Sequence, residues 1–269
     1  MSKATPFDVL AGDYDAVFTG SLIGEAQRRT SHTWLRPLFT GKTGLQVLEI
    51  NCGTGADACW MAEHGHFVTA TDGSPAMIDK AKQRSATTAL PHPPVFITAA
   101  FDELQTIFHG RRFDRIVSNF AGLNCISPPA MKKLSNQLQQ LLQPGGYLAV
   151  VVFGKYCWWD TCYYLLKARP RQAFRRWTNK EVVVPLSPQA NQPVYYYSIK
   201  NFARLWAPLQ LVEKKPVGLC IPPSWMEAYM QQHLNLFQTL VRWEEKLGSK
   251  SVFTSLADHA FLLFKKDAI

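Results

Sequence analysis

The chain has 269 residues, of which 47% are hydrophobic, and its formal net charge is +9. This length and composition exclude a disordered or low-complexity protein and predict a sizeable buried core. No apolar run reaches the roughly 18 residues that a membrane span needs, and the start, Met1–Val9, lacks the order of charged and apolar residues of a signal peptide. We therefore expect a cytoplasmic protein with no transmembrane segment.

The cysteines and the net charge exclude few classes of function. The six cysteines are scattered and lack metal-ligand spacing, so neither a zinc site nor a disulfide framework is predicted. The positive charge is compatible with nucleic acid, phospholipid or an acidic carrier protein, but equally with an enzyme that has a basic surface. Charge alone does not predict a nucleic-acid partner.

Between residues 45 and 153, short β-rich runs alternate with helical stretches, which is typical of a parallel sheet built from βα units. The predicted strands are Leu45–Ile50, Phe67–Thr71, Val95–Ala99, Arg115–Ser118 and Tyr147–Phe153. The predicted helices between them are Ala56–His64, Pro75–Arg84 and Pro128–Leu142. Ser74-Pro75 predicts the start of the second helix, and Pro144-Gly145-Gly146 the turn after the third.

The amino-acid composition of the sequence changes after Phe153. An aromatic run, Gly154–Leu166, precedes a cation-rich run, Lys167–Trp177, and together they predict an inserted helical cap. A polar stretch broken by proline, Val182–Pro193, then leads to the aromatic run Tyr195–Tyr197. The remaining predicted elements are a strand at Leu209–Lys215, a long amphipathic helix at Trp225–Leu247 and a final strand at Ala260–Lys265.

The stretch VLEINCGTGADA, residues 47–58, places a glycine-rich turn between a strand and a helix. A P-loop is excluded because no lysine follows Gly55. A dinucleotide site is weakly matched by Gly53, Gly55 and Ala58, with Asp72 ending the next strand. Glu49 disfavours that site, because a carboxylate repels a pyrophosphate but stabilises an ammonium group.

S-adenosylmethionine (SAM) has a cationic methionine end and two ribose hydroxyls, so Glu49 and Asp72 match its two ends. At these residues the sequence resembles the class I SAM-dependent methyltransferases, in the branch that acts on small molecules. Four motifs, in the family's order, carry the resemblance: EINCGTG (49–55), TDGSPAMI (71–78), FDRIVSNF (113–120) and LQPGGYL (142–148). DHAFLLFKK (258–266) is similar to the family's last strand, which is antiparallel.

The resemblance implies an α/β fold with a doubly wound, seven-stranded, mostly parallel sheet, an antiparallel last strand and helical cap insertions over the active site. It also implies SAM as the cofactor. We expect one methyltransferase domain over residues 1–269. Its expected parts are N-terminal lid helices (1–44), a cofactor-binding core (45–155), a cap insertion (156–198) and a segment that completes the sheet with a second helical insertion (199–269).

The family motifs imply a set of cofactor-binding residues at the carboxyl ends of the strands. They are Tyr14, Glu49, Asn51, Gly53, Thr54, Gly55, Asp72, Gly73, Met77, Phe101, Asp102 and Asn119. Two positions depart from the family: Asn51 replaces a glycine, which asparagine can do at positive φ, and Ala100 stands where many members carry an acid. Tyr14 either gains cation–π energy beside the sulfonium or packs in the core.

His259 is the candidate catalytic residue, as a general base at the start of the last strand, with a structural histidine as the alternative. Arg28 and Arg29 either steer the cofactor carboxylate or are charges on a helix surface. The cap 156–177 and Tyr195–Tyr197 either enclose an acceptor or only stabilise the fold.

We therefore expect methyl transfer to an oxygen, nitrogen or carbon nucleophile of a small aromatic or lipid-like acceptor. One alternative is an RNA or protein methyltransferase that uses the cations of Lys167–Lys180, although NFAG (119–122) lacks the family's motif for nucleobase amines. The other is a non-catalytic nucleotide- or NAD-binding protein built on the glycine turn.

Overall fold

A computed structural model describes residues 5–187 and 190–268 of the chain. The other residues, 1–4, 188–189 and 269, fall within the expected lid, cap and final segment and lie outside the described residues. In the described part, no helix has the length and apolar character to cross a bilayer.

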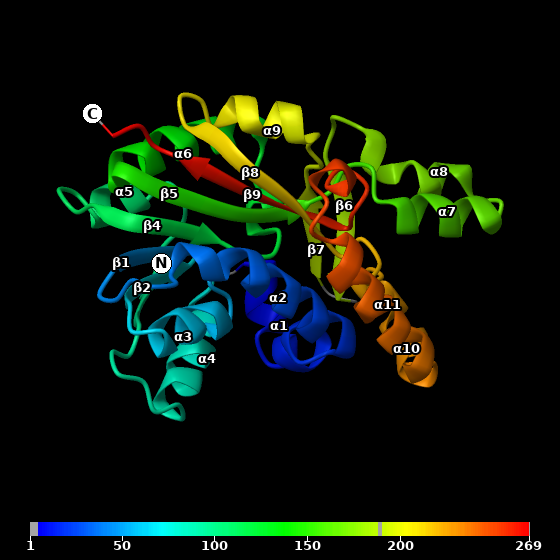
Figure 1. The fold of residues 1–269 in the computed structure, drawn as a ribbon, viewed down its shortest axis with the longest axis horizontal. Coiled ribbons are helices and arrows are strands. Elements are labelled where there is room, and N and C mark those ends of the chain that lie inside the picture. The colour runs from blue at the N-terminus through cyan, green and yellow to red at the C-terminus, as the bar shows by residue number, and fades with distance from the viewer. Residues whose placement is uncertain (1–4, 188–189, 269) are drawn as a thin grey trace.

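The fold centres on a seven-stranded sheet with the order β3-β2-β1-β4-β5-β9-β8 (Figure 1). Strands β1 to β5 are parallel, and β9 lies antiparallel between β5 and β8. The predicted fold class, including the antiparallel last strand, is confirmed. The strands are β1 Gln46–Ile50, β2 Phe67–Asp72, β3 Val95–Thr98, β4 Phe113–Ser118, β5 Leu142–Phe153, β8 Gln210–Val217 and β9 His259–Lys265.

Helices cover both faces of this sheet (Figure 1). They are α1 Pro6–Leu10, α2 Leu22–Leu35, α3 Ala56–Glu63, α4 Pro75–Ala86, α5 Leu104–Ile107, α6 Pro128–Leu141, α7 Trp158–Leu166, α8 Pro170–Ala173, α9 Ile199–Leu205, α10 Glu227–Gln232 and α11 Leu234–Leu247. A π-helical turn, η1, spans Asp15–Thr19. The predicted start of α4 is confirmed, since Ser74 Oγ accepts a hydrogen bond from Met77 N at 3.2 Å and Pro75 follows.

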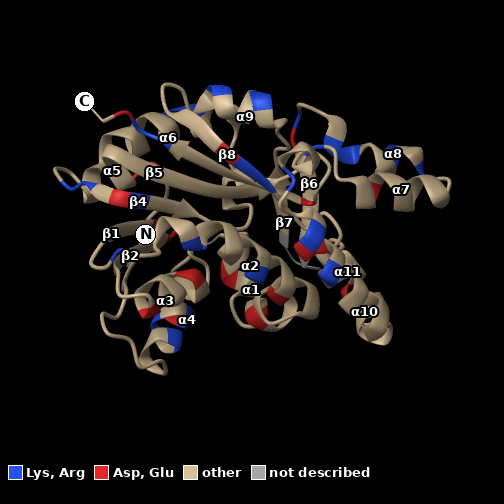
Figure 2. Cartoon of the chain, viewed as in Figure 1, with Lys and Arg blue, Asp and Glu red and all other residues tan. Residues whose placement is uncertain are grey.

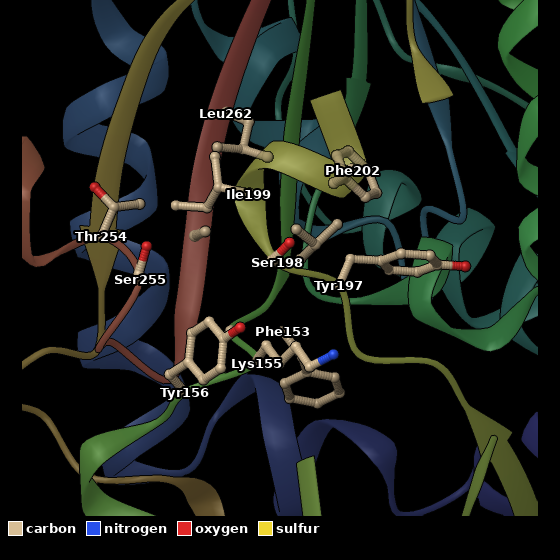
Figure 3. Close-up of a pocket in the computed structure, with 13 residues that line it drawn as sticks. Phe153, Lys155, Tyr156, Tyr197, Ser198, Ile199, Phe202, Thr254, Ser255 and Leu262 are labelled. Carbon is tan, nitrogen blue, oxygen red and sulfur yellow. The ribbon is translucent and has the colours of Figure 1, made fainter. Parts of the chain in front are cut away.

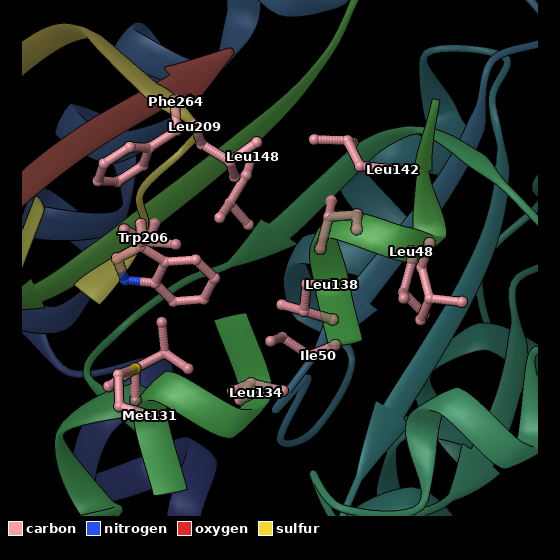
Figure 4. Close-up of a cluster of buried hydrophobic side chains, with 14 of the residues drawn as sticks. Leu48, Ile50, Met131, Leu134, Leu138, Leu142, Leu148, Trp206, Leu209 and Phe264 are labelled. Atoms are coloured by element: carbon pink, nitrogen blue, oxygen red, sulfur yellow. The ribbon is translucent and has the colours of Figure 1, made fainter. Parts of the chain in front are cut away.

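Two apolar layers hold the helices against the sheet because side chains alternate along each strand. Leu48 and Ile50 of β1 face α6, whose Leu134 and Leu138 pack against them (Figure 4). Val47 faces the other layer, which α3 and α4 cover. Each fully buried side chain of this kind stabilises the fold by about 1.5–3 kcal/mol.

After the fifth strand, the structure contains one element that the sequence did not predict, and one predicted helix was wrong. The proline-broken stretch at 182–193 is a β-hairpin of β6 (Val182–Ser187) and β7 (Ala190–Val194), which contacts α1. The single helix Trp225–Leu247 is two helices, α10 and α11, which meet at His233 with φ −129° and ψ 54°. Residues 231–236 are all exposed, so no apolar face supports a continuous helix there.

A buried carboxylate fixes α11 to the end of β8. Glu244 is 2% exposed, and its two oxygens accept four backbone N–H groups, from residues 218–221. Burial raises the pKa of Glu244, and the four N–H donors counter part of that increase. The turn that leaves β8 is therefore held by one side chain of a helix that follows it in the chain.

We expect Glu244→Gln to lower the free energy of unfolding by about 2–4 kcal/mol, because the new amide would leave buried N–H donors without an acceptor. Chemical denaturation measures this loss. The control is Glu245→Gln, an exposed neighbour on α11 that should change stability by less than about 0.5 kcal/mol. Equal losses in the two variants would contradict the assigned role of Glu244.

Candidate functional site

The glycine turn leaves β1 through a run of left-handed backbone. Asn51, Gly53 and Gly55 have φ values of 53°, 52° and 75°, and α3 begins directly afterwards. A Cβ on Gly55 would lie 2.8 Å from the Ala81 Cβ atom and 3.0 Å from the Phe96 ring. Gly55 is therefore required by packing as well as by its φ value. Gly53 is not crowded in this way, since its Cβ would meet only Tyr14, at 3.7 Å.

Asn51 uses its side chain to join the ends of β1 and β4. Its amide nitrogen donates to the Asn119 carbonyl at 3.0 Å, and its amide oxygen accepts from Ser118 Oγ at 2.6 Å. A side chain on Gly122 would collide with the Asn51 amide, so glycine at 122 makes room for asparagine at 51. Replacement of the family's glycine by Asn51 thus has a matching small residue on the facing loop.

Asp72 closes the other side of the turn. Its two carboxylate oxygens accept the backbone N–H groups of Gly53 and Ser74, each at 2.9 Å. Burial raises the pKa of Asp72, and these two hydrogen bonds oppose the increase. Each carboxylate oxygen has a second lone pair, so Asp72 can also accept two hydroxyl groups from a ligand.

Glu49 is the most unusual side chain of the site, since it is 1% exposed and its Oε2 atom has no hydrogen-bond partner among the described residues. Burial raises the pKa of its carboxyl group well above the usual range. The nearby Asp57 and Asp72 carboxylates raise the pKa further, while Arg28 lowers it. A buried carboxyl group with a free oxygen fits a ligand that carries a positive charge.

Asp57, in the first turn of α3, is the hub of a buried network. Its carboxylate forms an ion pair with Arg28, lies 2.6 Å from His32 Nε2 and accepts a hydrogen bond from Asn119 Nδ2 at 3.0 Å. Burial alone would raise the pKa of Asp57, but Arg28 and His32 hold it well below its usual range. Asn119 also donates to Ser31 at 3.2 Å, so its amide group connects β4 to α2.

Three members of this network, Asp57, His32 and Ser31, were not among the sequence candidates, and neither was Phe120 beside it. Arg28 had two open interpretations, and the structure makes it half-buried, with its guanidinium 4.9 Å from the centre of the Phe120 ring. The sequence feature that could have identified Arg28 and His32 as neighbours is their spacing, because residues four apart share one face of a helix. That face points at the glycine turn.

The N-terminal segment covers the turn. Asp15 accepts a hydrogen bond from Thr54 Oγ1 at 2.6 Å and pairs with Arg84 at 2.6 Å, while Asp8 accepts from the Ser74 hydroxyl. Beneath it lies a pocket of about 30 Å³, to which Tyr14, Thr54, Asn51, Gly53 and Asn119 contribute together with Arg28, Asp57 and Phe120. Burial raises the pKa of Tyr14 to about 12.

Seven of the twelve predicted cofactor residues do not line this pocket: Glu49, Gly55 and Asp72 of the turn itself, and four residues farther along the chain. Met77 is buried against Leu10 in a small cluster that also includes Tyr14. Phe101 packs against the main core and Asp102 is exposed. Gly73 follows Asp72 and lies beside open space.

His259 lies at the carboxyl edge of the parallel strands, where it pairs with Phe153, the last residue of β5. Its ring stacks on Phe153 at 4.7 Å and meets the edge of Phe120 at 5.6 Å. Phe120 lines the pocket at the glycine turn and His259 does not. The Nδ1 atom of His259 is 3.3 Å from an oxygen of Asp258, whose other oxygen pairs with Arg176 at 2.8 Å.

A second pocket lies between β5, β9 and α9 (Figure 3). Tyr156 of the cap and Tyr197 of the aromatic run both contribute to it, as do Lys155 and Phe202. Its volume is about 10 Å³, room for roughly one water molecule. It shares no lining residue with the pocket at the glycine turn.

The comparisons with known proteins agree with this geometry. A family model described as "Methyltransferase domain" matches residues 47–146. The demethylmenaquinone methyltransferase of Paenarthrobacter aurescens (strain TC1) is 28% identical over 191 residues, which are 68% of this chain and 69% of the relative.

Two solved structures share the fold. The CcbJ methyltransferase of Streptomyces caelestis has a TM-score of 0.64 at 15% identity, with 100% of each chain covered. The magnesium protoporphyrin IX methyltransferase of Synechocystis PCC 6803, solved with bound SAH, has a TM-score of 0.55 at 13% identity and covers 91% of this chain and 88% of its own. The family model and the sequence relatives show a methyltransferase domain at residues 47–146, and the solved structures show that the chain has the fold of the class I SAM-dependent methyltransferases.

Proposed function

We propose that the chain transfers the methyl group of SAM to an oxygen, nitrogen or carbon atom of a small aromatic or lipid-like acceptor. The observation that carries the cofactor site is the free buried oxygen of Glu49, beside Asp72 at the same edge of the sheet. The relative named demethylmenaquinone methyltransferase supports a quinone-like acceptor. The six cysteines are free in the structure, which supports action in the reducing cytoplasm.

In this proposal each end of the cofactor has its own carboxylate. Asp72 accepts the two ribose hydroxyls with the lone pairs that its backbone hydrogen bonds leave free. Glu49 accepts the ammonium group, and Tyr14 supplies an aromatic face near the sulfonium. Gly53, Thr54 and Asn51 shape the turn between them. Met77, Phe101, Asp102, Gly73, Gly55 and Asn119 complete the proposed surroundings of the cofactor.

SAM, when bound, supplies a methyl group that is already activated by its positive sulfur. The protein's task is then to align the acceptor atom with the carbon–sulfur bond and to exclude water, and alignment alone can lower the barrier by up to about 7–11 kcal/mol. For a hydroxyl or amine acceptor, we propose that His259 takes the proton on Nε2, because Nδ1 faces Asp258. Phe120 would have to move aside, since its ring edge lies against His259.

The proposed acceptor side is the carboxyl edge between the cap and the aromatic run. Tyr156 and Tyr197 already face one pocket there, and the cap starts directly after β5. We also propose that residues 1–269 work as one domain, with 1–44 as lid, 45–155 as cofactor core, 156–198 as cap and 199–269 as completion of the sheet. Both pockets are far smaller than the roughly 300–1,000 Å³ of ligand sites, so the lid must move for the cofactor to enter.

We expect Asp72→Ala to weaken SAM binding about a hundredfold, because two charge-assisted hydrogen bonds to the ribose are lost. Isothermal titration with SAM, S-adenosylhomocysteine and NAD measures the effect. Asp79→Ala, an exposed acid on α4 that is not among the proposed cofactor residues, is the matched control and should bind SAM nearly as well as the natural chain. Binding of NAD but not SAM would overturn the cofactor assignment.

We expect SAM binding to release a proton, because the ammonium group binds the ionised form of Glu49 while burial raises the pKa of that carboxyl group. Affinity should then rise with pH up to the raised pKa that Glu49 has in the free protein, and level off above it. Calorimetry in two buffers with different ionisation enthalpies counts the protons.

The matched control is Glu49→Gln, which keeps the shape of the side chain but has no proton to release. It should bind SAM more weakly and lose the part of the pH dependence that comes from Glu49. If the natural chain and this variant release the same number of protons, Glu49 is not the group that meets the ammonium.

A further inference from the structure

The outer end of the cap is a basic and apolar surface, formed by the turn between α7 and α8. Residues 165–172 are exposed without a break, and they project from the body of the molecule (Figure 1). Leu165 and Leu166 are 46% and 87% exposed. On the same cap, Phe174 and Trp177 are 42% and 46% exposed and meet edge to face at 5.0 Å. We call residues 165–177 the cap tip.

The cations of the cap tip fall into two groups. Arg175 and Arg176 pair with Asp160 at the base of the cap, and Arg176 also binds Asp258, so these two serve the fold. Lys167, Arg169 and Arg171 form no ion pair with any described residue. Residues 161–180 contain no acid, and Figure 2 shows the concentration of Lys and Arg around α8.

We propose that the cap tip docks on the surface of an anionic membrane. Exposed leucines and aromatic rings beside arginine and lysine are the side chains that lie at a bilayer interface. The apolar groups enter the region between headgroups and acyl chains, while the cations stay at the anionic phosphates. The proposal concerns binding of the protein and does not depend on which acceptor is methylated.

The composition of the cap tip favours a membrane over the other acidic partners. RNA has phosphates for the cations and bases for the aromatic rings, but it gives no reason for two exposed leucines. A bilayer accounts for the cations and the leucines together. Because the cap leaves the sheet at the end of β5, docking would also turn the carboxyl edge of the sheet toward the lipid.

The test is co-sedimentation of the full chain with vesicles of phosphatidylcholine, with and without phosphatidylglycerol. We expect binding to the anionic vesicles that weakens as salt is raised. Arg169→Gln with Arg171→Gln should reduce the binding about fivefold for each cation removed. Leu165→Ser with Leu166→Ser should reduce it about tenfold, and should remove the part that persists at high salt.

Each double variant has a matched control. Lys200→Gln with Arg204→Gln removes the same charge from exposed positions on α9, and Leu234→Ser with Leu236→Ser removes two leucines that are exposed at the start of α11. Both controls should bind vesicles like the natural chain. Thermal unfolding of all four variants shows that the fold is intact, since the changed side chains are exposed.

Three results would overturn the proposal. The first is that the chain does not bind anionic vesicles at low salt. The second is that the cap-tip variants and the controls lose vesicle binding equally, which would indicate a non-specific effect of the +9 charge. The third is a cap tip that binds single-stranded RNA, or a second copy of the chain, while vesicles are not bound. A loss of vesicle binding that is confined to the cap-tip variants would support the membrane proposal, even if the protein did not bind SAM.

Discussion

The site depends on a crowding of negative charge at one buried edge of the sheet. Glu49 and Asp72 end neighbouring strands, and Asp57 follows in the first turn of α3. The half-buried Arg28 is a cation beside them, and it forms an ion pair with Asp57. Glu49 is left with an elevated pKa and a free oxygen. Such an edge is best completed by a ligand that brings its own positive charge.

The sheet could be predicted from the sequence because each of its first five strands contains a short apolar run. The predicted turn Pro144-Gly145-Gly146 was wrong, because β5 begins at Leu142 and includes these residues. The positive φ of Asn51 followed from the few residue types that tolerate it. The Asp57 network could not be predicted in the same way, since Arg28, Asp57 and Asn119 come from three separate elements. These residues meet because of how α2 packs across the sheet, and a local sequence pattern does not predict that packing.

The errors after β5 have a similar origin. The hairpin β6–β7 contains Pro185 and Pro193, which a local rule takes as breaks, although the pair stands apart from the main sheet. The helix breaks at His233, where the side chains are exposed to solvent. Amphipathic spacing in the sequence does not show whether a packing partner is present. Glu227 on α10 instead receives the N–H groups of Leu22 and Ile23, so tertiary contact decides the direction of this helix.

We propose that the N-terminal lid and the cofactor site are coupled through the same carboxyl groups. The N-terminal segment places Tyr14 beside Gly53 and over the pocket, and we propose that this is the closed state of the lid, from which water is excluded. In that dry environment an ionised Glu49 is costly without a partner, so closure favours either a protonated Glu49 or a bound cation. A ligand that supplies the cation makes closure easier, and closure tightens its hold on the ligand, because coupling between two equilibria is reciprocal. In the proposed function, the unpaired oxygen of Glu49 therefore links cofactor binding to the exclusion of water that methyl transfer needs.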